Sequence, residues 1–287
     1  MLTSLYCDID DFYLLFNMQC EGTLLSQNSR QRLCCISHSE IMTILIHYHQ
    51  SGYRTFKWFY QKYVQVHLQH DFPTLPSYQR FIELMPRVLL PLTLYMNQRC
   101  VSGRGIAFID STPLRVCDNI RIPRHRTFVA EAGRGKSSTG WFYGFKLHLV
   151  VDDCGNIIAF SITSGNTDDR VPVPTLLKKV IGKVFGDRGY ISKKLVASLS
   201  TQGVELITTL KKNMKKITRN TFDQLLLRKR SIIETINDQL KNISEVEHTR
   251  HRSLTNYMIN IICALISYSY QEKKPSLNLQ CTGLVLA

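Results

Sequence analysis

Two short apolar runs, each closed by an aspartate, constrain the fold of this chain more than any other feature. Residues 105–109 precede Asp110, and residues 184–186 precede Asp187. Short apolar runs bounded by Gly or Pro are typical of buried strands. A carboxylate at the end of such a strand is costly to bury unless it is paired or bound to a metal. The sequence therefore predicts two buried strands that deliver their acids to one site.

A single helix is expected over residues 222–243, because apolar and charged side chains separate at about 100° per residue. The apolar face comprises Leu225, Leu226, Ile232, Ile233, Ile236, Leu240 and Ile243. Arg230, Glu234 and Lys241 lie on the other side. Because Arg230 and Glu234 are four residues apart, an ordinary surface ion pair is the alternative to a functional carboxylate.

Asp110, Asp187 and Glu234 together form the candidate catalytic and metal-binding site. Their carboxylate oxygens are hard ligands, which suit Mg²⁺ or Mn²⁺. Two such ions, about 3.5 to 4 Å apart, activate phosphodiester chemistry. We therefore expect two divalent cations as the cofactor.

The net charge of +14 is unevenly distributed along the chain. Residues 1–100 carry 8 basic and 7 acidic side chains (8 − 7 = +1), whereas residues 101–287 carry 28 and 15 (28 − 15 = +13). Residues 178–230 alone hold 14 basic and 3 acidic side chains. This concentration around the candidate acids indicates a polyanionic partner, and nucleic acid is the favoured one. A basic protein without a particular partner is the alternative.

Cysteine usage and hydropathy predict a soluble cytoplasmic protein. The 9 cysteines form no C-x-x-C pair, so neither a zinc site nor a disulfide framework is indicated. The N-terminal residues 1–11 carry acids and no basic region typical of a secretory signal. The apolar segment 258–265 is shorter than the roughly 20 residues that a membrane span requires.

An all-helical DNA-binding region is expected over residues 1–100. Helices are predicted at residues 8–18, 39–48, 56–66 and 77–96. Ser39 and Ser77 are the expected N-caps. The helix after Ser77 begins with polar, aromatic and basic residues, as a DNA-reading helix would, although a plain helical bundle fits the same pattern.

The remainder predicts an α/β domain over residues 101–270, followed by a loose tail at residues 271–287. A flexible basic loop is expected at 121–140; its relaxed phosphate-loop pattern, with Ala130 in place of Gly, is followed by a strand instead of a helix. The predicted order is a hairpin (141–151 and 157–163), helix 171–181, strand 183–185, helix 192–199, strand 204–210, basic loop 211–219 and helix 254–270. Three successive strands followed by helix and strand units predict a mixed sheet flanked by helices, as in a ribonuclease-H-like core.

The chain resembles the DDE transposases of bacterial insertion sequences. The resemblance rests on residues 108–112, 138–148 and 186–190 and on the face with Arg230, Glu234 and Lys241. The block at 138–148 is most similar to the insertion-sequence family numbered nine-eight-two. Related transposases carry a Y-x2-R-x3-E-x6-K signature, in which Leu227 here replaces the tyrosine. This departure leaves any tyrosine-dependent step at the DNA end in question.

This resemblance implies metal-dependent cleavage at element ends and transfer of the freed 3′-hydroxyl into target DNA. Arg230 and Lys241 would hold phosphates beside the scissile one. Lys211 and Lys212 of the basic loop are assigned to DNA contact as well. Lys146, His148 and Arg188 are further DNA-binding candidates, with structural or surface roles as equal alternatives.

The implied partners are double-stranded DNA, both as terminal inverted repeats and as target, and a second copy of the chain on paired ends. The implied location is the bacterial cytoplasm, in association with the nucleoid when DNA is bound. The alternatives are a metal-dependent nuclease that does not join DNA and a catalytically inactive DNA-binding protein. The three mutually repelling acids argue against the second alternative.

Overall fold

The computed structural model describes residues 2–20, 35–103, 105–137, 140–210, 213–214, 218–247, 250–277 and 279. The chain packs as two compact units. The helical unit comprises Met1–Arg99 and Leu240–Tyr270, and the sheet unit comprises Cys100–Gln239 and Gln271–Ala287. The segment Leu240–Tyr270 therefore groups with the N-terminal helices and not with the expected domain over residues 101–270.

The helical unit matches the expectation of an all-helical N-terminal region. Its elements are α1 (Leu2–Cys20), α2 (His38–Tyr48), α3 (Phe56–Phe59), the π-helix η1 (Tyr60–Val64), α4 (Gln65–His67), α5 (Tyr78–Leu84), the 3-10 helix η2 (Met85–Val88), α6 (Leu89–Arg99) and α11 (Leu254–Ser269). Ser77 caps α5 as predicted, because its Oγ accepts the backbone N–H of Arg80.

The cap of α2 corrects one prediction. Ser37, and not Ser39, caps this helix: Ser37 Oγ accepts the backbone N–H of Glu40, and Glu40 Oε2 accepts the N–H of Ser37 at 2.6 Å. Ser39 is buried within the first turn. The reciprocal pair is a capping box, which satisfies two backbone donors that a helix start leaves unpaired.

Helix α11 explains why the last segment belongs to the helical unit. Nearly all its residues from Asn256 to Tyr268 are buried, and the helix packs against α2 and α6. A helix that is apolar on most sides must be covered on most sides. Among the described residues, no helix is long and apolar enough to cross a membrane.

The sheet unit confirms the predicted α/β fold with a ribonuclease-H-like mixed sheet. Its strands are β1 (Gly105–Cys117), β2 (Gly133–Ser137), β3 (Gly140–Asp152), β4 (Ile157–Ser164), β5 (Gly182–Gly186) and β6 (Val204–Thr208). The order is β2-β3-β1-β5-β6, with β4 also paired to β3. β1 runs antiparallel to β3 and parallel to β5, which runs parallel to β6. The sequence predicted β1, β3 and β4 and the two later strands β5 and β6, but not β2, which is the fourth strand of the antiparallel part.

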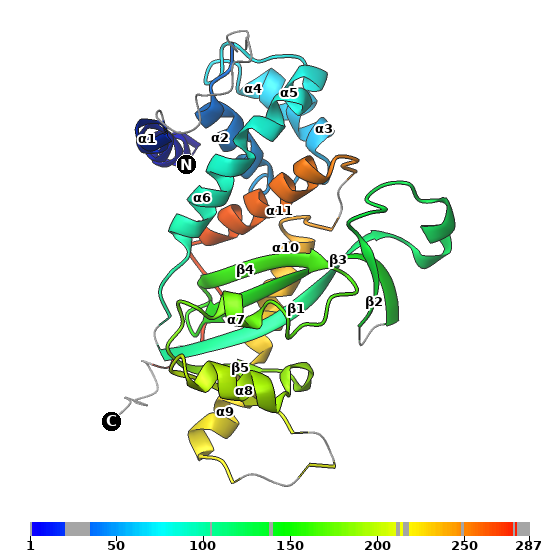
Figure 1. Ribbon diagram of the computed structural model, residues 1–287. Helices are drawn as coiled ribbons and strands as arrows, with labels where there is room; N and C mark the ends of the chain where they lie inside the picture. The colour runs from blue at the N-terminus through cyan, green and yellow to red at the C-terminus, as the bar shows by residue number, and fades with distance from the viewer. Residues whose placement is uncertain are drawn as a thin grey trace. The chain divides into compact units, whose positions relative to one another are not determined.

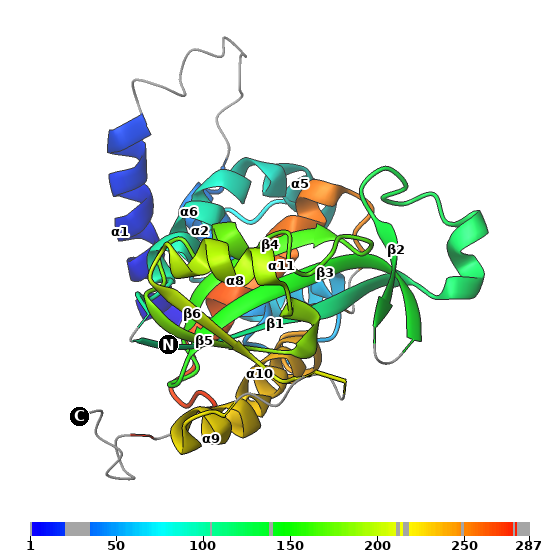
Figure 2. The same ribbon diagram turned by 60° about the horizontal axis from the view of Figure 1, so that its bottom comes forward.

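Helices cover both faces of this sheet (Figures 1 and 2). α7 (Val173–Leu176) and α8 (Lys193–Ser200) lie on one face, and α9 (Thr221–Lys229) and α10 (Ser231–Asn242) on the other. Ala107 and Ile109 of β1 share a buried cluster with Leu176 and Leu199 of the first pair. Side chains alternate along a strand, so Phe108 and Asp110 point toward the face covered by α9 and α10.

Three segments of the sheet unit differ from their predictions. Residues 133–137, expected in a flexible loop, form β2 and pair with Gly140–Gly144 of β3. The helix expected at 171–181 is reduced to the single turn α7, which begins directly after Pro172. The tail is attached at least to residue 277, because the Leu277 N–H donates to the carbonyl of Asp153.

The helix expected over residues 222–243 is two helices, α9 and α10, which meet at Arg230. Neither Gly nor Pro lies at the break. Instead, the break coincides with a residue whose guanidinium is held by two acids. Leu226, Ile232, Ile233 and Ile236 of the predicted apolar face are buried, whereas Leu225 and Ile243 are exposed.

Candidate active site

The register between β1 and β5 places Asp110 and Asp187 side by side. The last paired residues are Phe108 and Phe185, an offset of 185 − 108 = 77. Asp110 and Asp187 have the same offset, 187 − 110 = 77, and therefore occupy equivalent positions two residues further along. β5 ends at Gly186, but β1 continues to Cys117. The sequence had predicted Asp110 at the end of its strand, but in the structure Asp110 lies within β1.

Glu234 reaches this position from the first turn of α10, and Arg230 connects it to Asp110. Arg230 Nη2 donates to Glu234 Oε1 at 2.6 Å, and Arg230 Nη1 lies 3.7 Å from Asp110 Oδ1. The surface pair considered as an alternative is therefore present, but the same guanidinium also faces the strand aspartate. The structure brings Asp110, Arg230 and Glu234 together in the sheet unit.

Asn237 is a further member of the site that sequence reasoning missed. Its Nδ2 donates to Asp110 Oδ2 at 3.3 Å, and the side chain is buried. Asn237 follows Glu234 by three residues, so both lie on one face of α10. That spacing was visible in the sequence and could have identified it.

The electrostatics of Asp110 reflect the crowding of these acids. Burial raises the pKa of Asp110 to about 6, and the negative charges of Glu234 and Asp187 raise it as well. The Arg230 guanidinium and the backbone N–H of Ser111 act in the opposite direction. Three neighbouring carboxylates with one close guanidinium form a site at which additional positive charge would be stabilising.

The carboxylates offer the oxygen ligands that a hard divalent ion prefers. Asp110, Asp187 and Glu234 do not all place an oxygen within 4.8 Å of one another; in the described part of the chain, the only such group of acids, histidines or thiols is Asp152, Asp153 and Cys154. There the Asp152 carboxylate is already occupied by the β3–β4 turn, since it accepts the N–H groups of Cys154 and Asn156. The ligand chemistry of the Asp110 site fits Mg²⁺ or Mn²⁺, and the three carboxylates would have to come closer together to share bound ions.

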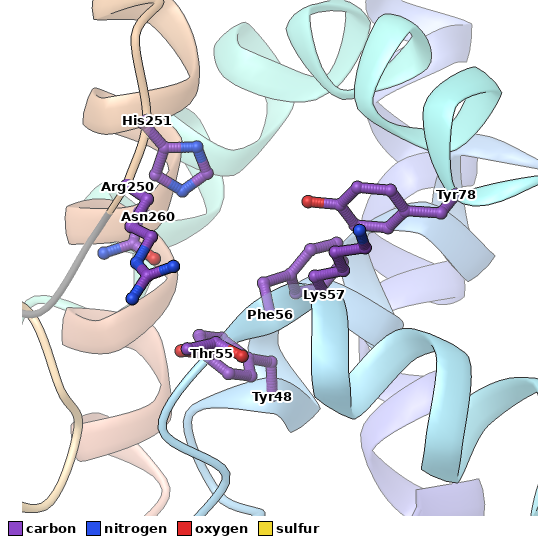
Figure 3. Close-up of a pocket in the computed structure, with 8 residues that line it drawn as sticks. All are labelled: Tyr48, Thr55, Phe56, Lys57, Tyr78, Arg250, His251 and Asn260. Atoms are coloured by element: carbon purple, nitrogen blue, oxygen red, sulfur yellow. The ribbon is translucent and has the colours of Figure 1, made fainter.

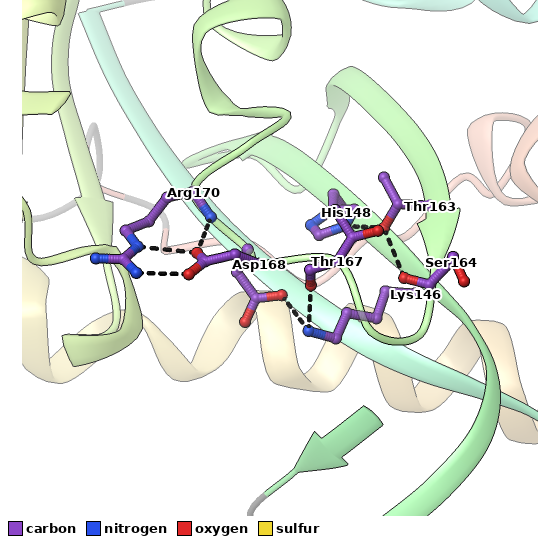
Figure 4. A network of polar contacts seen from close by, with 8 residues as sticks. Lys146, His148, Thr163, Ser164, Thr167, Asp168 and Arg170 are labelled. Carbon is purple, nitrogen blue, oxygen red and sulfur yellow. Dashed lines mark hydrogen bonds and ion pairs between the residues drawn. The ribbon is translucent and has the colours of Figure 1, made fainter. Parts of the chain in front are cut away.

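Lys146 and His148 lie on the face of the sheet opposite to Asp110, which favours the structural roles left open for them over DNA contact. Asp110 pairs with Leu149, so Leu149 shares its face while residues 146 and 148 point away. Lys146 Nζ donates to the Thr167 carbonyl and forms an ion pair with Asp169 at 2.9 Å. His148 has no exposed surface, and its Nε2 lies 2.8 Å from Thr163 Oγ1 (Figure 4). His148 cannot contact DNA in this structure, because it has no exposed surface.

The other predicted DNA contacts are distributed as follows. Arg188 is exposed directly after Asp187, whose carboxylate accepts its backbone N–H at 2.6 Å. Lys241 lies in the last turn of α10, within the helical unit, and forms an ion pair with Glu247 at 3.5 Å. Lys211 and Lys212 lie outside the described residues. Arg188 is thus adjacent to the acids along the chain, while Lys241 already has an acidic partner.

The helical unit contains a cavity of about 210 Å³ (Figure 3). Its lining residues are Tyr48, Thr55, Phe56, Lys57, Tyr78, Arg250, His251 and Asn260. Lys57 Nζ lies 5.9 Å from the centre of the Tyr78 ring. The cavity is smaller than the roughly 300–1,000 Å³ of most small-molecule pockets. None of its lining residues belongs to the sheet unit, so the cavity is not part of the carboxylate site.

These features define the class of the protein: a ribonuclease-H-like sheet with two aspartates on adjacent parallel strands and a glutamate on a helix across the same face. The family described as "Transposase DDE domain" matches residues 101–254, which is more than half of the chain. The chain therefore belongs to the family of transposases with a DDE domain.

Comparison with solved structures finds a cryo-EM structure described as the piggyBac transposase synaptic complex with hairpin DNA. It is 14% identical, the match covers 88% of this chain and 70% of that chain, and the TM-score is 0.47. Comparison with curated proteins finds no match. Transposases with DDE domains generally use divalent metal ions, in agreement with the ligands offered by the acidic site.

Proposed function

We propose that this chain is the transposase of a bacterial insertion sequence of the family numbered nine-eight-two. It cuts DNA at the ends of the element and transfers the freed 3′-hydroxyl into target DNA. One observation carries the proposal: Asp110, Asp187 and Glu234 converge in one unit although they come from three separate elements. Membership in the transposase family supports this reaction class.

Asp110, Asp187 and Glu234 are the proposed ligands of two divalent cations, Mg²⁺ or Mn²⁺. When bound, such ions lower the pKa of a water or hydroxyl nucleophile and stabilise the leaving oxygen. Glu234, whose side chain is 55% exposed, would supply the third carboxylate. Asn237 holds the Asp110 carboxylate in one orientation through its Nδ2 donor.

Arg230 has two roles in this proposal. In the metal-free protein, it compensates the charges of Asp110 and Glu234. During the reaction, its planar guanidinium binds a phosphate beside the scissile one, which a bidentate donor does well. Arg188, Lys211, Lys212 and Lys241 are proposed DNA contacts as well. If Arg230 moves from the carboxylates to a DNA phosphate, Asp110 and Glu234 become free to bind metal ions. DNA binding would then favour metal binding.

The test is a strand-transfer assay with Mg²⁺, end-labelled DNA from both flanks of the coding sequence and a supercoiled plasmid. Labelled plasmid products are expected. Cleavage without joining would identify the nuclease, and binding without cleavage the inactive DNA-binding protein. Asp187→Asn should abolish both reactions. The matched control is Glu205→Gln, because Glu205 is an exposed acid on β6 of the same unit, remote from Asp110 in the register.

We also propose that two chains act together on paired inverted repeats in the bacterial cytoplasm, because both element ends must be cut and joined. Light scattering of the protein with end DNA should give the mass of two chains and two DNA ends. A complex of one chain with one end, persisting under conditions that support strand transfer, would contradict this assembly.

A further inference from the structure

The exposed indole of Trp141 lies on a basic edge of the sheet unit. The proposed reaction of Asp110, Asp187 and Glu234 assigns no role to this edge. Trp141 is the second residue of β3 and is 51% exposed. Two cations lie over its ring: the Arg134 guanidinium carbon is 5.0 Å from the ring centre and Lys136 Nζ is 5.7 Å from it. Both cations come from β2, an edge strand that pairs only with β3 among the described strands. We call Arg134, Lys136 and Trp141 the indole platform.

The sequence of β2 directs these three side chains outward. Lys136 pairs with Trp141 across the ribbon, and residues 134 and 136 are exposed while Gly133 and Gly135 are buried. A side chain at Gly135 would clash with the Gly165 carbonyl and the Phe142 ring. The alternation Gly-Arg-Gly-Lys therefore leaves one face closely packed and places both cations beside the indole.

The surroundings of the platform are strongly basic. Residues 115–141 contain six basic and two acidic side chains (6 − 2 = +4). Arg121, Arg124 and Arg126 are exposed in or after the 3-10 helix η3 (Asn119–Arg124), whose Asn119 Nδ2 donates to the Trp141 carbonyl at 2.6 Å. η3 is thereby attached to the same strand. An aromatic ring among cations is the composition that binds unstacked nucleotides, with bases on the ring and phosphates on the cations.

We propose that the indole platform binds single-stranded DNA by stacking an unpaired base on Trp141. This inference rests on the proposed function, since cutting and joining expose unpaired nucleotides. Duplex DNA presents its phosphates outward and keeps its base faces stacked, so it can use Arg134 and Lys136 but not the indole. A purely structural role would instead use the same residues to protect an edge strand and to form a cross-strand pair.

The first experiment uses Trp141 as its own reporter. The sequence contains 2 Trp residues, so Trp58→Phe leaves Trp141 as the only indole. This variant is titrated in EDTA with an oligothymidylate and with a hairpin duplex that carries the same number of phosphates. We expect saturable quenching of the indole fluorescence by the single strand and little by the duplex. Absence of quenching, or equal quenching by both DNAs, would overturn the proposal.

The second experiment measures affinity by anisotropy of a labelled oligothymidylate. Trp141→Leu should weaken single-strand binding about 5- to 150-fold, the effect of losing one stacked base, and leave duplex binding unchanged. Trp141→Phe keeps an aromatic ring and should retain most of the affinity, which guards against a folding defect. Equal affinities of all three proteins would overturn the proposal. Because no cleavage is measured, the result is independent of the catalytic function, and the control variant Glu205→Gln should bind like the parent.

Discussion

Replacing Arg230 by methionine tests how the acidic site is stabilised before a metal binds. Methionine keeps an unbranched apolar side chain and removes the charge. The change leaves Asp110 and Glu234 without the guanidinium that faces both, at 3.7 Å and 2.6 Å. The contact with Asp110 is electrostatic, because Arg230 Nη1 has no hydrogen-bond partner among the described residues.

The expected loss of stability follows from the exposure of the two acids. The Glu234 side chain is 55% exposed, so its pair with Arg230 contributes about 0.3–0.5 kcal/mol, as helical pairs four residues apart do. The Asp110 side chain is 21% exposed, and leaving it without a cation costs about 1–3 kcal/mol. The variant should lose roughly 1–3 kcal/mol, or a melting temperature roughly 2–10 °C lower.

The loss should depend on pH in a defined direction. The pKa of Asp110 is raised to about 6 with Arg230 present, and removing this cation raises it further. The folded state then holds a proton that the unfolded state releases above about pH 4. The free energy of unfolding of Arg230→Met therefore increases as the pH falls from above about 6 toward about 4, because a protonated Asp110 needs no cation. The difference from the parent should be large near neutral pH and small near about pH 5.

Thermal unfolding in EDTA and then in Mg²⁺ measures both effects. A divalent ion at about 100 times its dissociation constant adds about 2.7 kcal/mol. The variant should gain more from Mg²⁺ than the parent, in which the ion competes with Arg230. Arg228→Met is the control, because it removes an exposed charge from the same helix end. Equal melting of both variants in EDTA at neutral pH would refute this reasoning.

Three further predictions concern the reaction, the DNA and the fold. Asp187→Asn should abolish cleavage and leave DNA affinity similar or tighter in gel shifts, since a negative charge near phosphates is lost; unchanged cleavage would remove Asp187 from the mechanism. DNA affinity should fall steeply with salt, as multiple phosphate contacts require, and a flat profile would argue against the basic segment as the binding surface. Burial lowers the pKa of His148 to about 4, so its contribution to stability is complete above about pH 6.5 and declines as pH falls toward 4. Between neutral pH and about pH 5, the free energy of unfolding in urea should fall by about 2 kcal/mol more for the parent than for His148→Gln. Identical pH profiles of the two proteins would contradict this.

The sequence predicted the acids because buried strands and a helix have strong local patterns. It could not predict the register between β1 and β3, which sets the face on which each residue lies. The alternation of Lys146 and His148 against Leu147 and Leu149 was predicted correctly. Only the pairing of Asp110 with Leu149 shows that the two polar residues lie on the opposite face. Side-chain period alone cannot relate two strands whose connection contains a further strand, β2.

Local signals also decided which details of the helices were predicted. The break at Arg230 has no sequence marker, because the apolar period continues through it without Gly or Pro. The structure shows the break at the residue whose guanidinium faces Asp110 and Glu234. By contrast, Ser37 and Glu40 have capping-box spacing. Asn237 similarly stands three residues after Glu234. Both could have been identified from the sequence.

The two faces of the sheet divide the polar residues into groups with opposite electrostatic balance. On one face, Lys146 is paired with Asp169, so its charge is compensated, and His148 Nε2 lies 2.8 Å from Thr163 Oγ1, although His148 Nδ1 has no hydrogen-bond partner among the described residues. On the other face, Asp110 shares one guanidinium with Glu234 and lies near Asp187. A fold that compensates the charge of Lys146 on one face could also have compensated the acids on the other. Neighbouring acids with too few cations lower the stability of the folded protein. Binding of cations at this site would explain why the acids are nevertheless present.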